Sequence, residues 1–582
     1  CPIFFSTSTV VIGSWEAIVG SILSVRGVVE EDLGVDTKIV VRMISHQPTR
    51  QSCPGIFGGY KVMKISWKRS IPLVGVLFSA MLVLGTANAK DILLYGGNQD
   101  IDNIDPATGE NYSINASLRS LYDALFIYRG DNIEPLLVES WTASDDAKVW
   151  TFTLRKGAVF HDGSPITAES VVYSFNRILE ISGPPSWRWS GIADENTAQA
   201  VDTHTVRFTL TKPFAPFVGT LTQLFVVNPA IVEANRGDDF GQSYLKLHEA
   251  GSGPFTQGRW EIGNIYEFVA VDDYWAGWHN DNHVDGVLWI IQRDAATQKN
   301  SLLAGETHIA DSPAGSDKDD IANAAGFHIT EDVGFFINTL KMNNQGKYTS
   351  DVNLRKAIAH AMNYDALPTV LDVKVTIMPG PTPSNFLGYT KAEVPTYDLD
   401  KAREYLAKTP WPDGDITLDY VYVTQFPREE IPGLILLEGL SKIGITLNMK
   451  PMLWPDMVAS CGSVDTGPDL INIYTLPSYL DPDANLYNQY HSEQWGSFNS
   501  CSFYKNDDVD AKLDKARVIG DMDERLALYA DVQQQIIADQ PSVWMYTEDS
   551  LVGFNDCVKG YLYSPMYPIT VLFQDLWMDG CN

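Results

Sequence analysis

Residue types that carry out covalent chemistry are present in this chain, but they do not fall into the spacings of the usual catalytic motifs. The sequence has no P-loop, no dinucleotide-binding glycine fingerprint, no His-Glu-x-x-His pair and no EF-hand loop. Ser252 lies between two glycines, but a nucleophilic serine of the G-x-S-x-G type needs a wider spacing between a strand and a helix. Carboxylates are numerous enough for a glycosidase pair, although the sequence does not show which two would face each other. We therefore expect no catalytic residue, no metal site and no cofactor.

The cysteines indicate disulfides and not a metal site. Four of the six follow residue 90, and none of these four stands in a C-x-x-C pair or beside a histidine cluster, which disfavours zinc. An even number of cysteines in an exported chain indicates two disulfides. Three pairings are possible, and proximity along the chain favours Cys461 with Cys501 and Cys557 with Cys581.

Residues 63–89 have the pattern of a secretory signal peptide. A positively charged start is followed by the apolar run Ile71–Leu84 and by the small-residue cleavage pattern that ends at Ala89. Residues 1–62 begin with Cys1 and show no targeting pattern, so we interpret them as a non-native or over-extended segment. The alternative is a genuine extension anchored by Ile71–Leu84, but this run is shorter than the ~20 residues that a membrane span needs. We therefore expect an exported protein, cleaved after Ala89.

Charge excludes some partners. The formal net charge of the 582-residue chain is −31, which argues against binding to nucleic acids or to anionic membrane surfaces. The negative charge is compatible with a preference for cationic ligands. The need to keep the protein soluble explains the same charge equally well.

The stretch Trp141–Leu179 contains the clearest local structure. Val149–Leu154 alternates polar and apolar residues as a strand does, and Asp162-Gly163 suits a tight turn. Thr167 can cap a following helix whose apolar residues fall on one face.

This stretch resembles the signature of the family-5 extracellular solute-binding proteins, the dipeptide- and oligopeptide-binding receptors of bacterial ABC importers. The matching positions are Trp141, Phe152, Leu154-Arg155, Gly157, Phe160-His161-Asp162-Gly163, Thr167-Ala168 and Val171-Val172-Tyr173-Ser174. Ser170 departs from the family pattern, which commonly has Asp there. The segment Gly251–Trp275 resembles a second conserved region of the same family.

The resemblance also implies where a ligand would bind. In peptide-binding members a Trp precedes a D-Y-x-[DE]-P motif, whose first acid pairs with the α-ammonium of the peptide. Trp454 matches the Trp, while Ser478, Tyr479 and Asp481 occupy the motif positions. Ser478 cannot supply the charge of the missing acid, so Asp481 or Asp483 would have to replace it, or the ligand lacks a free amine.

Further candidates come from loops and aromatic residues. Asn98 and Asp102 follow the first strand after residue 90, where open α/β sheets place ligands, although both could merely cap the loop. Trp187 and Arg188 lie in a Pro- and Gly-bounded loop and could stack on a ligand, or the tryptophans of this loop could pack internally. Tyr546 adds aromatic surface near the strand that returns to the first lobe.

The resemblance implies an α/β, two-lobed periplasmic binding protein of type II. We predict lobe I from residues 91–334 and 545–582, with an extra subdomain near 134–221, and lobe II from residues 335–544. The function implied is a periplasmic receptor that delivers a peptide or peptide-like solute to ABC permease subunits, as a monomer and without catalysis. An oligosaccharide ligand is the alternative, and a secreted hydrolase is a third hypothesis.

Overall fold

The computed structural model describes residues 27–29, 39–41, 90–109, 111–567 and 571–581. It divides into two units, Cys1–Thr86 and Ala87–Asn582. The described part of the first unit is an antiparallel pair of strands, β1 (Gly27–Val29) and β2 (Ile39–Val41). The predicted signal peptide lies outside the described residues, as does most of the segment 1–62. Within the described residues, no helix has both the length and the apolar character needed to cross a membrane.

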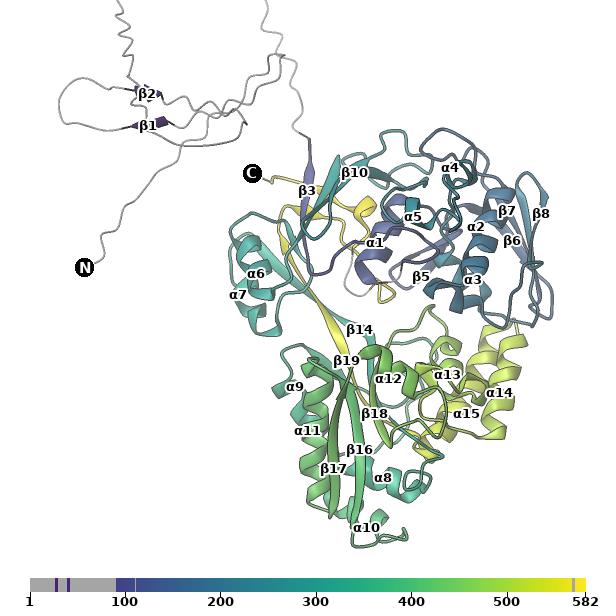
Figure 1. Ribbon diagram of the computed structural model, residues 1–582, viewed down its shortest axis with the longest axis vertical. Coiled ribbons are helices and arrows are strands. Elements are labelled where there is room, and N and C mark those ends of the chain that lie inside the picture. The colour runs from purple at the N-terminus through teal and green to yellow at the C-terminus, as the bar shows by residue number, and fades with distance from the viewer. Residues whose placement is uncertain (1–26, 30–38, 42–89, 110, 568–570, 582) are drawn as a thin grey trace, which may run out of the picture. The chain divides into compact units, whose positions relative to one another are not determined.

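An extended mixed sheet organises the second unit, and eleven strands belong to it among the described residues. Its main path is β10 (Phe255–Glu261), β11 (Ile265–Ala270), β12 (Gly286–Ile291), β3 (Ile92–Gly97), β13 (Ile309–Ala310), β19 (Ser542–Asn555), β14 (Phe327–Met342), β18 (Leu470–Thr475), β16 (Ile416–Val423) and β17 (Ile445–Met452), with β15 (Val375–Ile377) paired to β19. The first five strands belong to one lobe, lobe I, and β16–β18 belong to the other, lobe II (Figure 1).

Strands β14 and β19 connect the two lobes (Figure 1). They pair antiparallel from Phe327 opposite Asn555 to Lys341 opposite Ser542. The register shifts between Asp332 and Phe336, so the ladder is interrupted by an irregularity partway along this connection. The two lobes are therefore linked by two long strands whose pairing register is interrupted partway along.

The stretch that resembles the family signature forms a small sheet in lobe I. The order of its four strands is β6 (Val138–Ala143), β7 (Val149–Leu154), β9 (Thr205–Thr209) and β8 (Ala198–Asp202), and helix α2 (Ala168–Ile181) packs beside them. The Thr167 side chain accepts a hydrogen bond from the Ser170 backbone N–H, as expected for the cap. Gly163 has a φ of +81°, which the predicted turn requires. The strand, turn and helix predicted here are confirmed.

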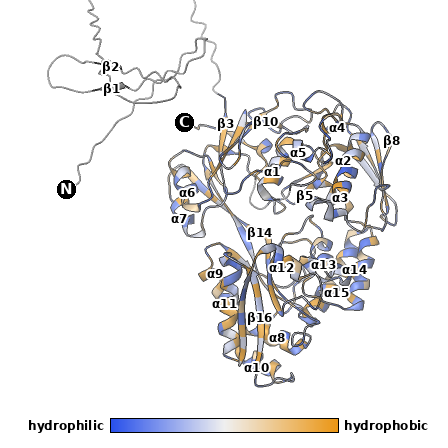
Figure 2. Cartoon of the chain, viewed as in Figure 1, coloured by the Kyte–Doolittle hydropathy of each residue, from blue (hydrophilic) through white to orange (hydrophobic). Residues whose placement is uncertain are grey.

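The remaining helices cover the sheets. The helices of lobe I are α1 (Tyr112–Leu121), α3 (Phe217–Thr220), α4 (Pro229–Ala234), α5 (Gln242–Leu245), α6 (Ala295–Leu303) and α7 (Lys318–Ala322). Lobe I also contains two short strand pairs, β4 (Phe126–Arg129) with β5 (Asn132–Pro135) and, near the C-terminus, β20 (Val558–Lys559) with β21 (Trp577–Met578). The helices of lobe II are α8 (Val352–Ala361), α9 (Leu367–Val370), α10 (Leu399–Leu406), α11 (Pro427–Ser441), α12 (Trp454–Ser460), α13 (Pro482–Tyr490), α14 (Asp507–Val518) and α15 (Met522–Asp539). Helices α14 and α15 carry both hydrophilic and hydrophobic residues, as expected for helices with one packed face (Figure 2).

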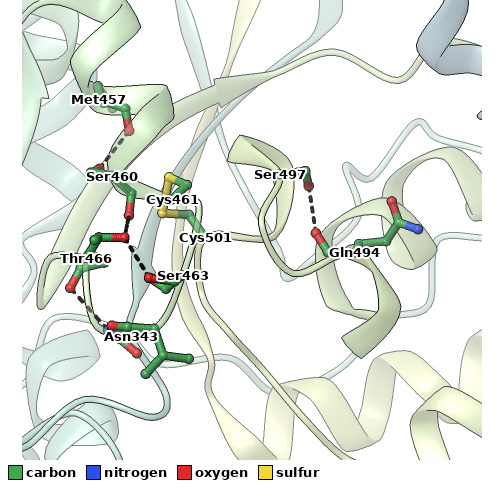
Figure 3. Close-up of a disulfide and its surroundings, with 11 residues drawn as sticks. Asn343, Met457, Ser460, Cys461, Ser463, Thr466, Gln494, Ser497 and Cys501 are labelled. Atoms are coloured by element: carbon green, nitrogen blue, oxygen red, sulfur yellow. Dashed lines mark hydrogen bonds between the residues drawn. A yellow bond between two sulfur atoms is a disulfide. The ribbon is translucent and has the colours of Figure 1, made fainter.

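Both predicted disulfides are present. Cys461 is bonded to Cys501, and Cys557 is bonded to Cys581. The first lies at the C-terminal end of helix α12, among hydrogen-bonded serine and threonine side chains (Figure 3). It thereby ties the end of this helix to the segment that follows residue 497.

Candidate functional site

A cavity of about 1540 Å³ is lined by residues of both lobes. Lobe I contributes residues that include Arg119 and Trp187, and lobe II contributes residues that include Glu429, Trp454 and Ser478. The volume exceeds the roughly 300–1,000 Å³ of an ordinary small-molecule pocket, so it has room for a ligand larger than one amino acid.

Aromatic rings form much of the cavity wall. Trp187 and Trp454 are 39% and 43% exposed, and both line the cavity. Phe336 stacks on Tyr474 with ring centres 4.5 Å apart. Exposed indole rings beside a cavity can cover apolar parts of a ligand or stack on its rings. The two tryptophans predicted for the site therefore both line the cavity, and their contact with a ligand stays a prediction.

The two tryptophans of the 184–189 loop have different roles. Trp189 is fully buried, and its indole N–H donates a hydrogen bond to the Thr220 hydroxyl at 3.0 Å. Trp187 is exposed to the cavity, and the Arg188 guanidinium lies 5.3 Å from its ring centre. Internal packing thus holds for Trp189 but not for Trp187.

The disulfide Cys461–Cys501 supports this wall. It joins the end of α12, which begins at Trp454, to the segment that contains Phe498. The rings of Trp454 and Phe498 lie 5.4 Å apart and edge to face. The crosslink therefore holds together two segments that line the same side of the cavity.

Ser478 and Tyr479 lie in the loop between β18 and α13 and line the cavity. The Ser478 hydroxyl oxygen is buried and has no hydrogen-bond partner among the described residues. The Tyr479 hydroxyl donates to Asp483 at 2.7 Å, and its ring packs edge-on against Phe214 of lobe I. Ser478 thus lines the cavity with an unpaired hydroxyl, and its contact with a ligand stays a prediction, whereas the Tyr479 ring and hydroxyl make contacts within the protein.

Asp481 is placed differently from the expectation. Its carboxylate is 2.6 Å from the Arg525 guanidinium, and both side chains are buried. It also caps helix α13, where it accepts a hydrogen bond from the Asp483 backbone N–H. Asp481 is not among the cavity-lining residues.

Asp483, the other acid considered as a replacement for Ser478, forms a bidentate pair with Arg517 at 2.8 and 2.9 Å. Both acids are therefore neutralised inside lobe II.

The predicted positions Asn98 and Asp102 are not among the residues that line the cavity. The Asn98 side-chain amide donates to the Ser312 hydroxyl at 2.9 Å, and its backbone N–H donates to Asp311. Asp102 is exposed. Their neighbour Gln99 is the residue of this loop that lines the cavity. The loop therefore reaches the cavity through Gln99 and not through the two predicted side chains, and its contact with a ligand stays a prediction.

Tyr546 does not face the cavity, which corrects its prediction as a ligand-binding residue. It is fully buried in β19, and its hydroxyl donates to the Arg428 carbonyl oxygen at 2.7 Å. Its backbone pairs with β14 on one edge and with β15 on the other, and its hydroxyl also lies 2.5 Å from the Tyr474 hydroxyl, so the side chain is held by internal hydrogen bonds.

Glu429 is a cavity-lining residue that the sequence reasoning missed. It lies in the first turn of α11 and is 2% exposed. One carboxylate oxygen accepts a hydrogen bond from the Val423 backbone N–H at 2.7 Å. Burial raises the pKa of Glu429 to about 7, although this hydrogen bond opposes the shift. The available signal was an acid just after a strand, at the start of a helix.

Arg119 and Arg188 place guanidinium groups on the lobe I side of the cavity. Arg119 lies over the Tyr567 ring at 3.8 Å, and burial lowers its pKa to about 10, so it stays charged at neutral pH. The Arg188 guanidinium donates to the Pro185 carbonyl oxygen at 3.2 Å. The cavity therefore carries positive charge from lobe I and a buried carboxyl group from lobe II.

His308 lies near Cys557 and Cys581, close enough for the three to resemble a metal-binding cluster. Both sulfur atoms are used in the disulfide, so neither is available as a thiolate ligand. This cluster is explained by the crosslink.

Comparison with known proteins gives a consistent family. The model of the bacterial extracellular solute-binding proteins, family 5 (middle region), matches residues 132–497. The chain is 30% identical to the probable D,D-dipeptide-binding periplasmic protein DdpA of Escherichia coli over 86% of this chain and 98% of that protein. It is 27% identical to heme-binding protein A of Haemophilus influenzae over 78% and 87% of the two chains.

A solved structure shows the same architecture. The ABC transporter-associated periplasmic binding protein DppA of Helicobacter pylori, in complex with the peptide STSA, superposes with a TM-score of 0.70 and 26% identity. The match covers 84% of this chain and 98% of that one.

Proposed function

Because the chain belongs to the bacterial extracellular solute-binding proteins of family 5, we propose that it captures a peptide or peptide-like solute in the periplasm and delivers it to an ABC permease. The observation that carries this proposal is the large cavity lined by both lobes, with exposed tryptophans and charged groups in its wall. A relative described as a probable D,D-dipeptide-binding protein and a similar fold holding the peptide STSA support the peptide class.

Ligand binding by two lobes gives the mechanism. A ligand that touches both lobes favours the arrangement in which they are close, by the difference in its affinity for the two states. Contacts between the lobes are already present beside the cavity: the Leu480 backbone N–H donates to the Tyr128 hydroxyl, and Ala215 donates to the Arg517 carbonyl oxygen. We propose that these contacts belong to the ligand-bound state that the permease recognises, and that no covalent step is needed.

Export and domain boundaries belong to the same proposal. A periplasmic receptor needs export, which residues 63–89 would direct before cleavage after Ala89. Lobe I is proposed to span residues 91–334 and 545–582, and lobe II residues 335–544. We propose that the receptor acts as a monomer.

An oligosaccharide is the second candidate ligand. It is favoured by the exposed rings of Trp187 and Trp454, which can stack on sugar faces, and by the neutral hydroxyl of Ser478 in the wall. Family membership does not decide between the two classes, because one fold serves many ligands.

Thermal unfolding of residues 90–582 across dipeptides, oligopeptides and oligosaccharides tests the proposal. A ligand present at 100 times its dissociation constant stabilises by about 2.7 kcal/mol, which shifts the unfolding midpoint clearly. A shift with peptides supports the peptide receptor. A shift with sugars alone refutes it in favour of the second candidate. Peptide recovered in hydrolysed form would instead show an enzyme.

A further inference from the structure

Glu429 and Ser478 reach the cavity from the same edge of the lobe II sheet. Strands β16 and β18 are parallel neighbours, with Tyr420 opposite Leu470 and Val421 opposite Ile471. Glu429 follows the carboxyl end of β16, and Ser478 follows the carboxyl end of β18. The carboxyl ends of adjacent parallel strands lie together, which is where such sheets bind ligands.

Aromatic packing holds these two loops together. Phe426, three residues before Glu429, packs edge-on against Tyr474, four residues before Ser478, at 5.5 Å. The Glu429 backbone carbonyl oxygen accepts hydrogen bonds from the Tyr420 hydroxyl at 2.7 Å and from the Asn472 side-chain amide at 3.3 Å. The position of Glu429 is thus fixed by neighbouring strands and does not depend on a mobile side chain.

The carboxyl group of Glu429 lacks a cationic partner within the described part of the chain. Its pKa is shifted by burial and by the Val423 hydrogen bond, with no contribution from a positive charge. The other carboxyl group that lines the cavity, Glu493, is 3.4 Å from the Lys212 ammonium. A buried carboxylate is costly unless a cation or several hydrogen bonds compensate it.

The groups that face Glu429 do not supply this compensation. Tyr420 of β16 and Tyr546 of β19 lie against it, and burial raises the pKa of both phenols above their usual range, so they are neutral. On its own helix, the charge of Arg428 is used by Glu548 at 2.6 Å, and Glu430 lies beside the Tyr422 hydroxyl. The described residues therefore leave the ionised form of Glu429 without a neighbouring positive charge.

We propose that Glu429 receives the cationic group of the ligand, and that the ligand is a peptide or amino-acid derivative with a free amino group. The inference rests on the proposed function and specifies its substrate class. The neutral Ser478 hydroxyl lies on the neighbouring loop and can accept a hydrogen bond from the same ammonium group. Arg119 and Arg188 line the lobe I side of the cavity, where their positive charge suits an anionic or carbonyl end of the ligand.

The ligand cation then competes with a proton for Glu429. Because the carboxyl group titrates near neutrality in the empty cavity, binding of a cation should release a proton. Affinity for an amine ligand should fall roughly tenfold for each pH unit below about pH 6. A ligand without a positive charge should show no such dependence through this residue.

Titration calorimetry on the whole chain from residue 90 tests the inference with a short peptide and its N-acetylated form. We expect the wild-type protein to prefer the free amine, and Glu429→Gln to weaken its binding about 100-fold or more, as for a buried charge pair that loses one partner. Glu430→Gln is the matched control, because this acid is the next residue on the same helix and does not line the cavity. It should change the affinity less than about threefold.

A second readout does not depend on any variant. Wild-type binding measured at pH 7 in two buffers of different ionisation enthalpy should show release of about half a proton per ligand. Equal affinities for the free and acetylated peptides, no proton release, or unchanged binding by Glu429→Gln would overturn the inference and leave the peptide receptor intact. A wild-type protein that binds sugars and no peptide would overturn the proposed function and this inference together.

Discussion

Replacement of Asp481 by Asn separates a structural acid from a ligand-binding one. The Asp481 carboxylate lies 2.6 Å from Arg525, and the two side chains are 8% and 3% exposed. Asp481 also caps helix α13 through the Asp483 backbone N–H at 3.0 Å. Asn is as good a cap as Asp, so Asp481→Asn removes the charge and keeps the cap.

The expected loss of stability follows from this geometry. Removing one partner of a buried ion pair costs about 3–5 kcal/mol, because the other charge is left buried and uncompensated. Arg525 keeps a hydrogen bond to the Ala516 carbonyl oxygen at 3.1 Å and one to the Tyr529 hydroxyl at 3.3 Å. We therefore expect the low end of this range, about 3 kcal/mol.

Urea unfolding of the ligand-free protein measures this loss. Asp102→Asn is the matched control, because this Asp is exposed and its substitution should change the free energy of unfolding by less than about 0.5 kcal/mol. Asp481→Asn combined with Arg525→Met should recover part of the stability, since a buried pair replaced as a whole is often neutral. The coupling between the two single changes should then exceed about 1 kcal/mol.

The ligand affinity of Asp481→Asn is the measurement that could refute a purely structural role for Asp481. Asp481 is outside the cavity wall, so Asp481→Asn should leave the dissociation constant within about twofold at temperatures where the protein is folded. Normal stability together with a tenfold weaker affinity would show that Asp481 contacts the ligand. The sequence-based prediction would then be correct and the structural assignment wrong.

Further predictions concern two buried titratable groups and a disulfide. Glu429→Gln should stabilise the ligand-free protein by about 3 kcal/mol at pH 8 and hardly at all at pH 4. The reason is that the pKa of Glu429 is raised from 4.5 to about 7, so the wild-type protein loses stability as the pH rises through this range. Equal urea midpoints of the two proteins at pH 8 would contradict this. Burial lowers the pKa of Lys341 to about 7, so between pH 7 and 10.5 the unfolded chain binds more protons than the folded protein. The stability of the wild-type protein should therefore rise relative to that of Lys341→Met as the pH increases across this range. Parallel stability profiles of the two proteins would contradict this. Cys461→Ser with Cys501→Ser opens a crosslink between residues 40 apart, which should lower the free energy of unfolding by up to about 4 kcal/mol and weaken ligand binding through Trp454, as denaturant unfolding and calorimetry would show.

Local interactions explain what the sequence predicted well. The strand Val149–Leu154 and the Thr167 cap depend on neighbours within a few residues, and both are present. The disulfides followed from proximity along the chain. Trp454 and Ser478 were located through the resemblance, and both line the cavity.

Long-range contacts explain what the sequence did not predict. Arg525 is 44 residues from Asp481, and nothing in the motif indicates that this acid is already neutralised. Tyr546 is fully buried, and its hydroxyl is hydrogen-bonded to Tyr474 and to the Arg428 carbonyl oxygen, which lie 72 and 118 residues away in the sequence. Glu429 acquires its place in the cavity from the parallel pairing of β16 with β18, which periodicity alone does not show.

The most direct measurement is a crystal structure of residues 90–582 with the peptide that stabilises the protein most. We expect an intact peptide in the cavity between the lobes, with its amino group at hydrogen-bond distance from the Glu429 carboxylate and with Trp187 and Trp454 against its side chains. A peptide bound outside this cavity, or an amino group paired with Asp481, would contradict the proposed binding site.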